Sequence, residues 1–503
     1  MHKLVEKGKY HGQTMSIKKS LPRASAILLV CVLLFILFNV TTMMSSVLSD
    51  KSVPQAVKGD IDLSKIVLSE VSSVPLAGNW RFYWQKLLTP EQITQNKEEP
   101  RYIPTPRPWI RTTIDGKSIP EQGVATYHVN VQTDKTYANL SLKIPSVGTA
   151  YRLYIDNDLM SKGGKVGYTP ETSEPGYNAN TVLFKPKSNQ FSITVQVSNH
   201  DYHSGGLWRV LRLGNTKNIQ QEQYQLIIRS AFLLAIFLTV ALFNLIQFTL
   251  RTADPLPVII AVTCLMLGLR EIGTSQVLHI AGLTDWSFDT YSKISYLTFY
   301  ATVPLMIAYF HMTFWRDYKK SIMAVMYLLC IAASLLVLFS SPMVFSQTLP
   351  FFQGITVLFM IYVFWGLIQA VRNQRHGARL LMLGSIFLFS LVINDILFHL
   401  AIIDTTLMVS FGLLAFVLCQ NYLTYMRFIN DGMQKELLSE TLEERNQELQ
   451  NFSQSLEEKV AQRTSELAEA NEKLGELAHQ DMLTGLPNRR GMIQFIEDSM
   501  VQY

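Results

Sequence analysis

The sequence predicts a multidomain membrane protein that combines an all-β domain, a bundle of transmembrane helices and a long polar helix. Of the 503 residues, 48% are hydrophobic and 17% are charged, whereas soluble proteins carry about 25% charged residues. Uncharged apolar runs of about 20 residues, long enough to cross a bilayer, recur along the chain. The polar stretches between and after these runs have strand and helix periodicities. A wholly cytosolic enzyme is therefore not expected.

The net charge and the positions of the cysteines indicate which partners and bound groups are not expected. The formal net charge of +5 is too small and too dispersed for a nucleic-acid-binding surface, so we expect no nucleic-acid partner. The four cysteines fall inside apolar runs, where neither a disulfide framework nor a closely spaced zinc site is indicated. They are Cys31, Cys264, Cys330 and Cys419. We expect no metal site and no bound cofactor in this chain.

The first apolar run spans residues 24–44 and follows a lysine-rich N-terminus, residues 1–23, which we place in the cytoplasm. Because the run is long and no A-x-A-like site follows it, we interpret it as a retained anchor, with a cleaved signal segment as the alternative. Seven further runs form a bundle over residues 225–428. They span 226–250, 256–281, 291–314, 321–341, 351–371, 379–402 and 405–428.

The loops of the bundle predict its orientation, because Lys and Arg near membrane ends stay cytoplasmic. Basic residues occur only in the first, third and fifth loops: Arg251; Arg316, Lys319 and Lys320; Arg372, Arg375 and Arg379. The second and sixth loops carry acidic residues instead, namely Asp285, Asp289 and Asp404. We therefore place the polar block of residues 45–224 outside the cytoplasm and the segment after Arg427 inside it.

The outside block alternates apolar and polar residues in short runs, as half-buried antiparallel strands do. Examples are 125–131, 151–155 and 191–197. Turn formers separate the runs, among them Asp115-Gly116 and Asp156-Asn157, which tolerate positive φ. This pattern predicts a β-sandwich of the jelly-roll kind.

Ligand contacts in this block are expected around one loop-like segment, 199–208, which combines amide, imidazole, carboxylate and indole groups. The candidates are Asn199, His200, Asp201, His203 and Trp208, with Tyr154 as an added aromatic surface. A structural corner is the competing interpretation of this segment. Most tryptophans of a small sandwich lie in its core, and we expect this of Trp80, Trp84 and Trp109.

Four polar residues in the bundle also require partners, because ionisable groups within a bilayer are costly. Arg270 and Glu271 lie in the second run of the bundle, and Asn394 and Asp395 lie at a similar depth in the sixth. An ion pair between Arg270 and Asp395, with Lys293 nearby, would form a polar layer. This layer could relay a signal to the helices, or it could be a static pair that fixes helix register.

The segment 429–480 contains no proline and predicts one long helix. Apolar or small residues recur on it at three-four spacing with one phase shift, as in a coiled-coil seam. They are Leu438, Leu442, Leu449, Phe452, Leu456, Val460, Leu467, Ala470, Leu474 and Leu477. A parallel homodimer that transmits rotation is one interpretation, and a passive spacer is the other.

Several phrases resemble known bacterial families. Gly78-Asn-Trp-Arg-Phe-Tyr-Trp84, Ile103-Pro-Thr-Pro-Arg-Pro-Trp109, Tyr151-Arg-Leu-Tyr154 and 198–208, followed by seven helices, are similar to seven-transmembrane receptors with diverse intracellular signalling modules. The resemblance implies a galactose-binding-like jelly roll in the periplasm that holds a carbohydrate or another small molecule. It also implies a multi-pass protein of the bacterial inner membrane, with the lipid bilayer and its ligand as partners.

The last segment, 481–503, resembles the opening of a GGDEF diguanylate cyclase domain. The matching residues are Asp481, Leu483, Thr484, Gly485, Leu486, Asn488, Arg489 and Arg490. The resemblance implies synthesis of cyclic di-GMP from GTP with Mg²⁺ in a complete domain. The catalytic part is not present in this sequence, so we expect a truncated domain with no catalytic residues of its own.

The leading interpretation is thus a receptor that controls a cyclase output. A catalytically inactive receptor or scaffold that acts through coiled-coil partners is the alternative. A sensor histidine kinase with His479 as phospho-acceptor is disfavoured, because kinase-type flanking residues and ATP-binding boxes are not found. A transporter is disfavoured by the long helix and the cyclase-like opening.

Overall fold

The computed structural model describes residues 53–95, 99–176, 179–250, 252–275, 277–399, 405 and 407–501, with isolated residues at 30, 34, 37 and 41. The predicted N-terminus 1–23 and almost all of the predicted crossing 24–44, including Cys31, lie outside the described residues. The chain divides into two compact units, residues 1–424 and 425–503.

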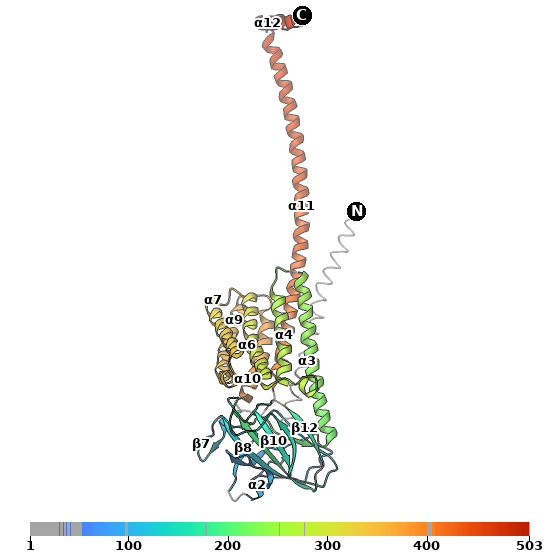
Figure 1. The fold of residues 1–503 in the computed structure, drawn as a ribbon. Helices are drawn as coiled ribbons and strands as arrows, with labels where there is room; N and C mark the ends of the chain where they lie inside the picture. Colours follow the sequence, from blue (N-terminus) through green and yellow to red (C-terminus); the bar gives the residue numbers. More distant parts are fainter. Residues whose placement is uncertain are drawn as a thin grey trace. The chain divides into compact units, whose positions relative to one another are not determined.

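A β domain precedes the helices in the first unit, and two sheets dominate it (Figure 1). The larger sheet has the strand order β11 (Asp158–Gly163), β10 (Ala150–Ile155), β13 (Gln190–Asn199), β8 (Gly123–Thr133), β3 (Gly78–Trp84), β4 (Arg101–Thr105). In it β1 (Asp60–Leu63) pairs parallel with β8, and the other ladders are antiparallel. The smaller sheet has the order β12 (Asn180–Phe184), β9 (Leu140–Ile144), β15 (Arg212–Gly214), β2 (Val74–Pro75).

Short elements complete the β domain. They are helix α2 (Pro90–Gln95), the 3-10 turn η1 (Trp109–Arg111), the pair β5 (Arg107–Pro108) with β14 (Gly206–Leu207), and the hairpin β6 (Thr113–Ile114) with β7 (Lys117–Ser118). The β6–β7 turn has φ of 51° at Asp115 and 80° at Gly116, the positive values that such tight hairpins require. The predicted turn chemistry is confirmed here.

One apolar core joins the two sheets. Trp80, Tyr127 and Leu153 of the larger sheet and Leu142 and Leu213 of the smaller sheet belong to the same buried cluster. Trp80 and Trp109 are fully buried, as the core interpretation predicts, while Trp84 is partly buried and packs against the cluster. The predicted β-sheet domain is confirmed, and its jelly-roll strand order stays a prediction.

The helices that follow include most of the predicted crossings. They are α3 (Thr216–Leu250), α4 (Leu256–Ser275), α5 (Val277–Ile280), α6 (Phe288–Thr313), α7 (Lys320–Phe339), α8 (Pro342–Ser346), α9 (Leu349–Arg372), α10 (Ala378–His399) and α11 (Val409–His479). Among the described residues, six helices are long and apolar enough to cross a membrane: α3, α4, α7, α9, α10 and α11. Helix α6, the predicted third crossing of the bundle, carries many hydroxyl side chains and packs between α4 and α7.

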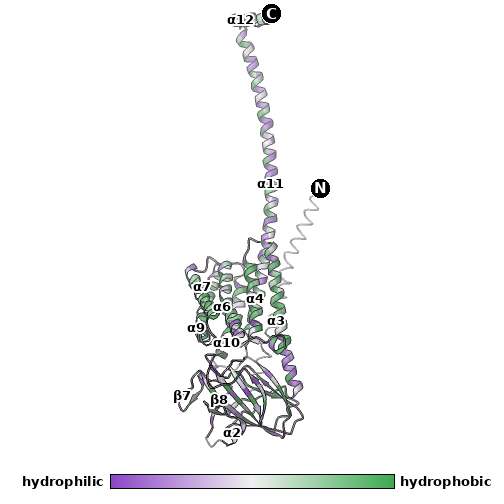
Figure 2. Cartoon of the chain, viewed as in Figure 1, coloured by the Kyte–Doolittle hydropathy of each residue, from purple (hydrophilic) through white to green (hydrophobic). Residues whose placement is uncertain are grey.

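Two helices depart from the boundaries that hydropathy indicates. Helix α3 begins at Thr216, and its polar first turns precede the predicted boundary at residue 225, as the colours of Figure 2 show. Helix α11 continues from the bundle through the predicted rod without a break. Its buried residues all lie between Phe411 and Thr424, and its large apolar residues from Leu437 to Leu477 are exposed.

Candidate functional site

The outer face of the larger sheet carries polar side chains, because strand residues alternate between the two faces. Core residues such as Val195 point inward, and their neighbours in sequence point to the opposite face. The pairing register aligns these outward residues in two rows that cross four strands. One row is Arg152, Gln196, Thr126 and Tyr83, and the other is Tyr154, Thr194, His128 and Arg81.

Many of the polar side chains on this outer face are buried, although polar residues are mostly exposed in folded proteins. Thr126 and Thr194 have no exposed surface, Gln196 is 2% exposed and His128 is 8% exposed. Helix α2 and the loop around Tyr168 lie against the same face, where they border two open cavities. The first measures about 210 Å³ and includes His128 and Asn130. The second measures about 500 Å³ and includes Arg152 and Gln196.

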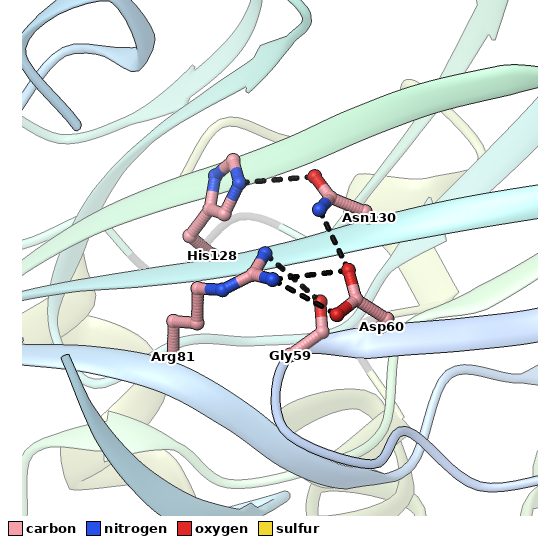
Figure 3. Close-up of polar contacts among 5 residues, drawn as sticks. All are labelled: Gly59, Asp60, Arg81, His128 and Asn130. Atoms are coloured by element: carbon pink, nitrogen blue, oxygen red, sulfur yellow. Dashed lines mark hydrogen bonds and ion pairs between the residues drawn. The ribbon is translucent and has the colours of Figure 1, made fainter. Parts of the chain in front are cut away.

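A chain of polar contacts borders the first cavity (Figure 3). Arg81 Nη2 donates to both carboxylate oxygens of Asp60 at 3.0 and 2.9 Å, and Asn130 Nδ2 donates to Asp60 Oδ1 at 2.7 Å. The Asn130 amide oxygen therefore faces His128, whose Nε2 lies 3.1 Å from it and donates. His128 Nδ1 then accepts from Thr194 Oγ1 at 2.9 Å. The neutral imidazole is fully hydrogen bonded.

This arrangement disfavours protonation of His128. Burial, with a smaller contribution from the nearby Arg81 cation, lowers the pKa of His128 to about 4. The hydrogen bond to Asn130 and the charge of Asp60 oppose the shift but are weaker. His128 is therefore neutral at pH 7 and serves as a rigid part of the sheet surface.

The predicted ligand segment forms a structural corner at Asn199. This residue has no exposed surface, and its Nδ2 donates to the carbonyls of Glu121 and Tyr202 at 2.8 and 2.7 Å. The next glycines, Gly205 and Gly206, lie so close to the Trp109 ring that a Cβ at either position would overlap it. The competing interpretation of this segment therefore accounts for its amide and its glycine pair.

The remaining candidates of the segment lie apart from one another. His200 Nε2 lies 3.2 Å from the carbonyl of Gly167, which lines the larger cavity. The Trp208 indole donates to the Ser204 carbonyl at 2.9 Å and covers Gly148. Burial raises the pKa of Asp201, while the charge of His200 opposes this.

His203 belongs to the boundary between the β domain and the helices. Its backbone N–H donates to Ser346 Oγ at 3.1 Å, and the neighbouring Tyr202 hydroxyl lies 2.7 Å from that of Tyr296 in α6. Burial, with a smaller contribution from the charge of Arg111, lowers the pKa of His203 to about 4. Of the six ligand candidates, Tyr154 is the one that lines either of the two cavities described above.

A second polar site lies within the bundle and centres on Glu271 of α4. Glu271 is 6% exposed, and its two oxygens accept from different helices. Oε1 accepts from Ser230 Oγ of α3 at 2.8 Å, and Oε2 accepts from Ser410 Oγ of α11 at 3.0 Å. One buried carboxylate therefore joins three helices.

Asp395 of α10 accepts hydrogen bonds from the backbone N–H groups at the start of α11. Its Oδ1 accepts from the backbone N–H of Met408 at 2.8 Å, and its Oδ2 accepts from that of Val409 at 3.1 Å. Asn394 Nδ2 also donates to Oδ1, at 3.0 Å. A carboxylate suits this position because the first N–H groups of a helix have no partners within it and carry partial positive charge.

The direct ion pair between Arg270 and Asp395 is not formed among the described residues, and this prediction was wrong. Arg270 Nη1 instead donates to the Ser295 carbonyl at 3.3 Å, and its guanidinium lies 5.2 Å from the Phe299 ring centre. The Asp395 oxygens are held by backbone N–H groups, so the two charges attract each other without contact. Lys293 pairs with Asp289 at 3.0 Å on its own helix.

Helix α3 connects the β domain to this polar layer. Thr216 Oγ1 accepts from Ser141 Oγ of β9 at 3.1 Å, and Asn218 Nδ2 donates to the Val71 carbonyl at 2.6 Å. Glu222 lies 3.6 Å from Lys143 Nζ and 3.9 Å from Arg212 Nε. The polar first turns of α3 therefore pack on the smaller sheet, and Ser230 follows two turns later.

The cyclase-like motif forms a compact turn between α11 and α12 (Arg489–Val501). Asp481 Oδ1 accepts from the N–H groups of Leu483 and Thr484, both at 3.1 Å. Asn488 Nδ2 donates to the Ala478 carbonyl at 2.8 Å, while its Oδ1 accepts from the Arg490 and Gly491 N–H groups at 3.0 and 3.1 Å. Gly485 has a φ of 74°. Within the motif, Leu483 is 97% exposed and Leu486 is 66% exposed.

Within the described part of the chain, no group of three or more His, Cys, Asp or Glu side chains is arranged to hold a metal ion. The described cysteines, Cys264, Cys330 and Cys419, are buried free thiols.

The apolar helices and the buried polar layer between them define a multi-pass membrane protein. Residues 227–424 match the family described as 7TM diverse intracellular signalling. This match to the bundle supports a seven-transmembrane receptor that acts in signal transduction. No curated protein matches the chain.

Solved structures that share local similarity include glycosidases. They include a β-glucuronidase of an uncultured Clostridium species (15% identity, TM-score 0.21, 28% of each chain) and a GH2 β-galacturonidase from Eisenbergiella tayi bound to galacturonate (15%, 0.21, 30% of this chain and 26% of that one). A putative β-galactosidase from Bacteroides fragilis gives 17% identity, a TM-score of 0.21, and coverage of 28% and 22%. The chain spans less than a third of each of these proteins, and these likenesses carry no functional argument.

Sequence reasoning missed the cavity on the outer sheet face. The alternation of β10 and β13 placed Arg152 and Gln196 on one face, but their adjacency depends on pairing between strands that are 35 or more residues apart in sequence. It also missed the serines around Glu271. A search for hydroxyl residues at matching depths could have found Ser230 and Ser410.

Proposed function

We propose that this receptor binds a small-molecule or carbohydrate ligand in its β domain, on the periplasmic side of the bacterial inner membrane, and controls a cytoplasmic diguanylate cyclase output. The family match to residues 227–424 supports the receptor class. The basic residues in the odd-numbered loops support the orientation, because such residues stay cytoplasmic. The observation that carries the coupling is the pair of hydrogen bonds from Ser230 and Ser410 to Glu271.

The Glu271 contacts support coupling because they join the helix that holds the β domain to the helix that leads to the output. Helix α3 is packed on the smaller sheet through Asn218 and Glu222. It meets α11 again through Asn244 Nδ2, which donates to Asn421 Oδ1 at 2.5 Å. A movement of α3 relative to the β domain would therefore change the partners of α11. A relay needs such an element with two arrangements that a ligand can bias.

Helix α11 supports transmission beyond the bundle. Its large apolar residues after the bundle remain exposed, including Leu442 at 56% and Leu449 at 65%. A parallel homodimer would bury this seam, and apolar residues at three-four spacing are the pattern that such a dimer uses. We therefore infer that two copies of α11 pair and pass a change of register or rotation along their length.

The turn at 481–490 supports a cyclase output. Asp481 and Asn488 close the turn and fix the direction of α12, while Leu483 and Leu486 remain exposed. Apolar side chains in this position would dock on the body of a GGDEF domain, which would supply Mg²⁺ and GTP binding. The alternative scaffold function would need no such body. DNA beyond the Tyr503 codon that encodes a Gly-Gly-Asp/Glu-Glu-Phe motif would favour the cyclase.

The coupling is tested in cells that express this chain joined after Tyr503 to the remaining part of a GGDEF domain. Cyclic di-GMP is measured for the parent, Ser410→Ala and Glu271→Gln. Each change weakens one hydrogen-bond connection worth about 1 kcal/mol, so we expect about a fivefold change in output. Ser390→Ala is the matched control, because Ser390 Oγ bonds only to the Phe387 carbonyl of its own helix. Unchanged output in both variants would contradict the coupling.

A further inference from the structure

The larger cavity on the outer sheet face contains one charge. Among the described residues that line it, Arg152 is the only ionised side chain, and Tyr154, Tyr168, Gln196, Thr89 and Gln92 are neutral. Arg152 Nη2 makes one long hydrogen bond, to the Val166 carbonyl at 3.5 Å. No described carboxylate forms an ion pair with it. The cavity therefore offers a guanidinium with free donors, and such a group binds carboxylates in bidentate geometry.

Gln196 provides a second, independent indication of a ligand. Its side chain is 98% buried, and its Oε1 has no hydrogen-bond partner. A buried acceptor without a partner is costly, so it is expected to meet a donor. Gln196 lies opposite Arg152 in the strand register. A ligand that reaches Arg152 can therefore place a hydroxyl group against the Gln196 acceptor.

Two tyrosines give the cavity apolar surface. The Tyr168 side chain is 59% exposed, and its hydroxyl accepts from the Leu87 N–H at 3.1 Å, which fixes one end of the ring. Tyr154 lines the same cavity from β10. Aromatic rings with fixed polar ends pack against the C–H faces of sugar rings. The volume of about 500 Å³ lies within the range of small-molecule sites.

We propose that this cavity binds a polyhydroxylated carboxylate, a small sugar acid, with its carboxylate on Arg152 and a hydroxyl on Gln196. This assignment deepens the proposed function and rests on it only for the consequence of binding. The binding step itself is independent of the output. Arg152 discriminates acids from neutral sugars, while Tyr168 contributes to both.

The test compares glucuronate with glucose, which differ at C6 by a carboxylate in place of a hydroxymethyl group, and uses acetate as the carboxylate alone. Binding to the full chain in lipid nanodiscs is measured by calorimetry. We expect glucuronate to bind about tenfold more tightly than glucose, because a charge-assisted hydrogen bond adds about 1.5 kcal/mol or more. Acetate is expected to bind more weakly than glucuronate, since it makes no contact with the tyrosines.

Variants test which side chains cause the preference for glucuronate over glucose. Arg152→Gln is expected to abolish the difference between acid and neutral sugar, and Arg152→Lys to retain part of it. Tyr168→Ala should weaken both ligands by a similar factor. Arg107→Gln is the control, since Arg107 is exposed and lies outside the cavity. Thermal unfolding midpoints confirm that each variant is folded.

Equal affinity for glucuronate and glucose, failure of every acid to bind up to millimolar concentration, or an unchanged preference in Arg152→Gln would overturn the proposal. Glu271→Gln separates this result from the coupling, because it should keep the affinity for glucuronate within about twofold while cyclic di-GMP output changes. Acid binding without any output response would contradict the proposed function and leave the site established.

Discussion

The β domain and the helical bundle both bury polar side chains, and the acceptors of Gln196 in the first and of Glu271 and Asp395 in the second are satisfied differently. In the bundle, both oxygens of Glu271 and both oxygens of Asp395 accept hydrogen bonds from neighbouring helices or helix ends. On the outer sheet face, Gln196 Oε1 has no partner and borders a cavity. The difference teaches that the Glu271 and Asp395 carboxylates connect helices to one another, whereas Gln196 offers an acceptor to an external partner.

The largest expected effect is from Asp395→Ala. Removal of the carboxylate leaves two N–H groups at the start of α11 unsatisfied in the interior, which costs about 3–5 kcal/mol in the free energy of unfolding. Asp395→Asn keeps one acceptor and should cost about half as much. The measurement is denaturant unfolding of the detergent-solubilised chain. Equal stability of Asp395→Ala and the parent would break the comparison.

The second effect is a loss of stability of the β domain in acid. His128 has a native pKa of about 4, below the unfolded value of about 6.5. The native state therefore binds fewer protons, so stability is complete above the unfolded pKa and falls as the pH drops from about 6.5 to about 4. The full loss from His128 is about 3 kcal/mol.

Chemical unfolding at a series of pH values measures this loss. His203, whose pKa is also about 4, adds a loss of the same sign, while the raised pKa of Asp201 has the opposite sign. His128→Gln should remove roughly half of the acid-induced loss that the two histidines cause. An identical pH dependence in His128→Gln would show that His128 is not buried in its neutral form.

The third effect contrasts two amides of β13. Asn199→Ala removes two donors to the Glu121 and Tyr202 carbonyls, and we expect a loss of about 2–3 kcal/mol in unfolding free energy. Gln196→Met should change it by less than about 1 kcal/mol, because the acceptor it removes has no internal partner. A larger cost for Gln196→Met than for Asn199→Ala would reverse the interpretation of the two sites.

The smallest effect is from Lys293→Ala. Its partner Asp289 lies one turn away on the same helix, and both side chains are partly exposed. Such a pair contributes about 0–1 kcal/mol, so thermal unfolding should be nearly unchanged. A large loss would place Lys293 in the polar layer, as the sequence first suggested.

Local patterns predicted local structure well. The runs 125–131, 151–155 and 191–197 lie in β8, β10 and β13, because alternation depends only on neighbouring residues. Hydropathy placed the bundle helices, but it could not place the start of α3. Residues such as Asn218 and Glu222 are polar because they bind the smaller sheet, and hydropathy alone therefore assigns them to the polar block 45–224 and not to a helix of the bundle.

The sequence could not predict which groups the buried polar side chains contact. Depth alone suggested that Arg270 pairs with Asp395, but depth contains no information on helix rotation or on the N–H groups that compete for the carboxylate. Those groups belong to Met408 and Val409. The same limit applies to the outer sheet face, where Tyr154 was the one candidate named and its neighbours depend on strand register.

The early start of α3 removes any flexible tether between the β domain and the first helix of the bundle. The amides from Ile219 onward donate within the chain, beginning with Ile219 N–H to the Asn215 carbonyl at 3.1 Å, so they should exchange slowly with deuterium. Limited proteolysis should find no cleavage point between Gly214 and the bundle. The β domain is therefore attached to the bundle through a continuous helix. A tilt of the β domain must be accompanied by a tilt of α3.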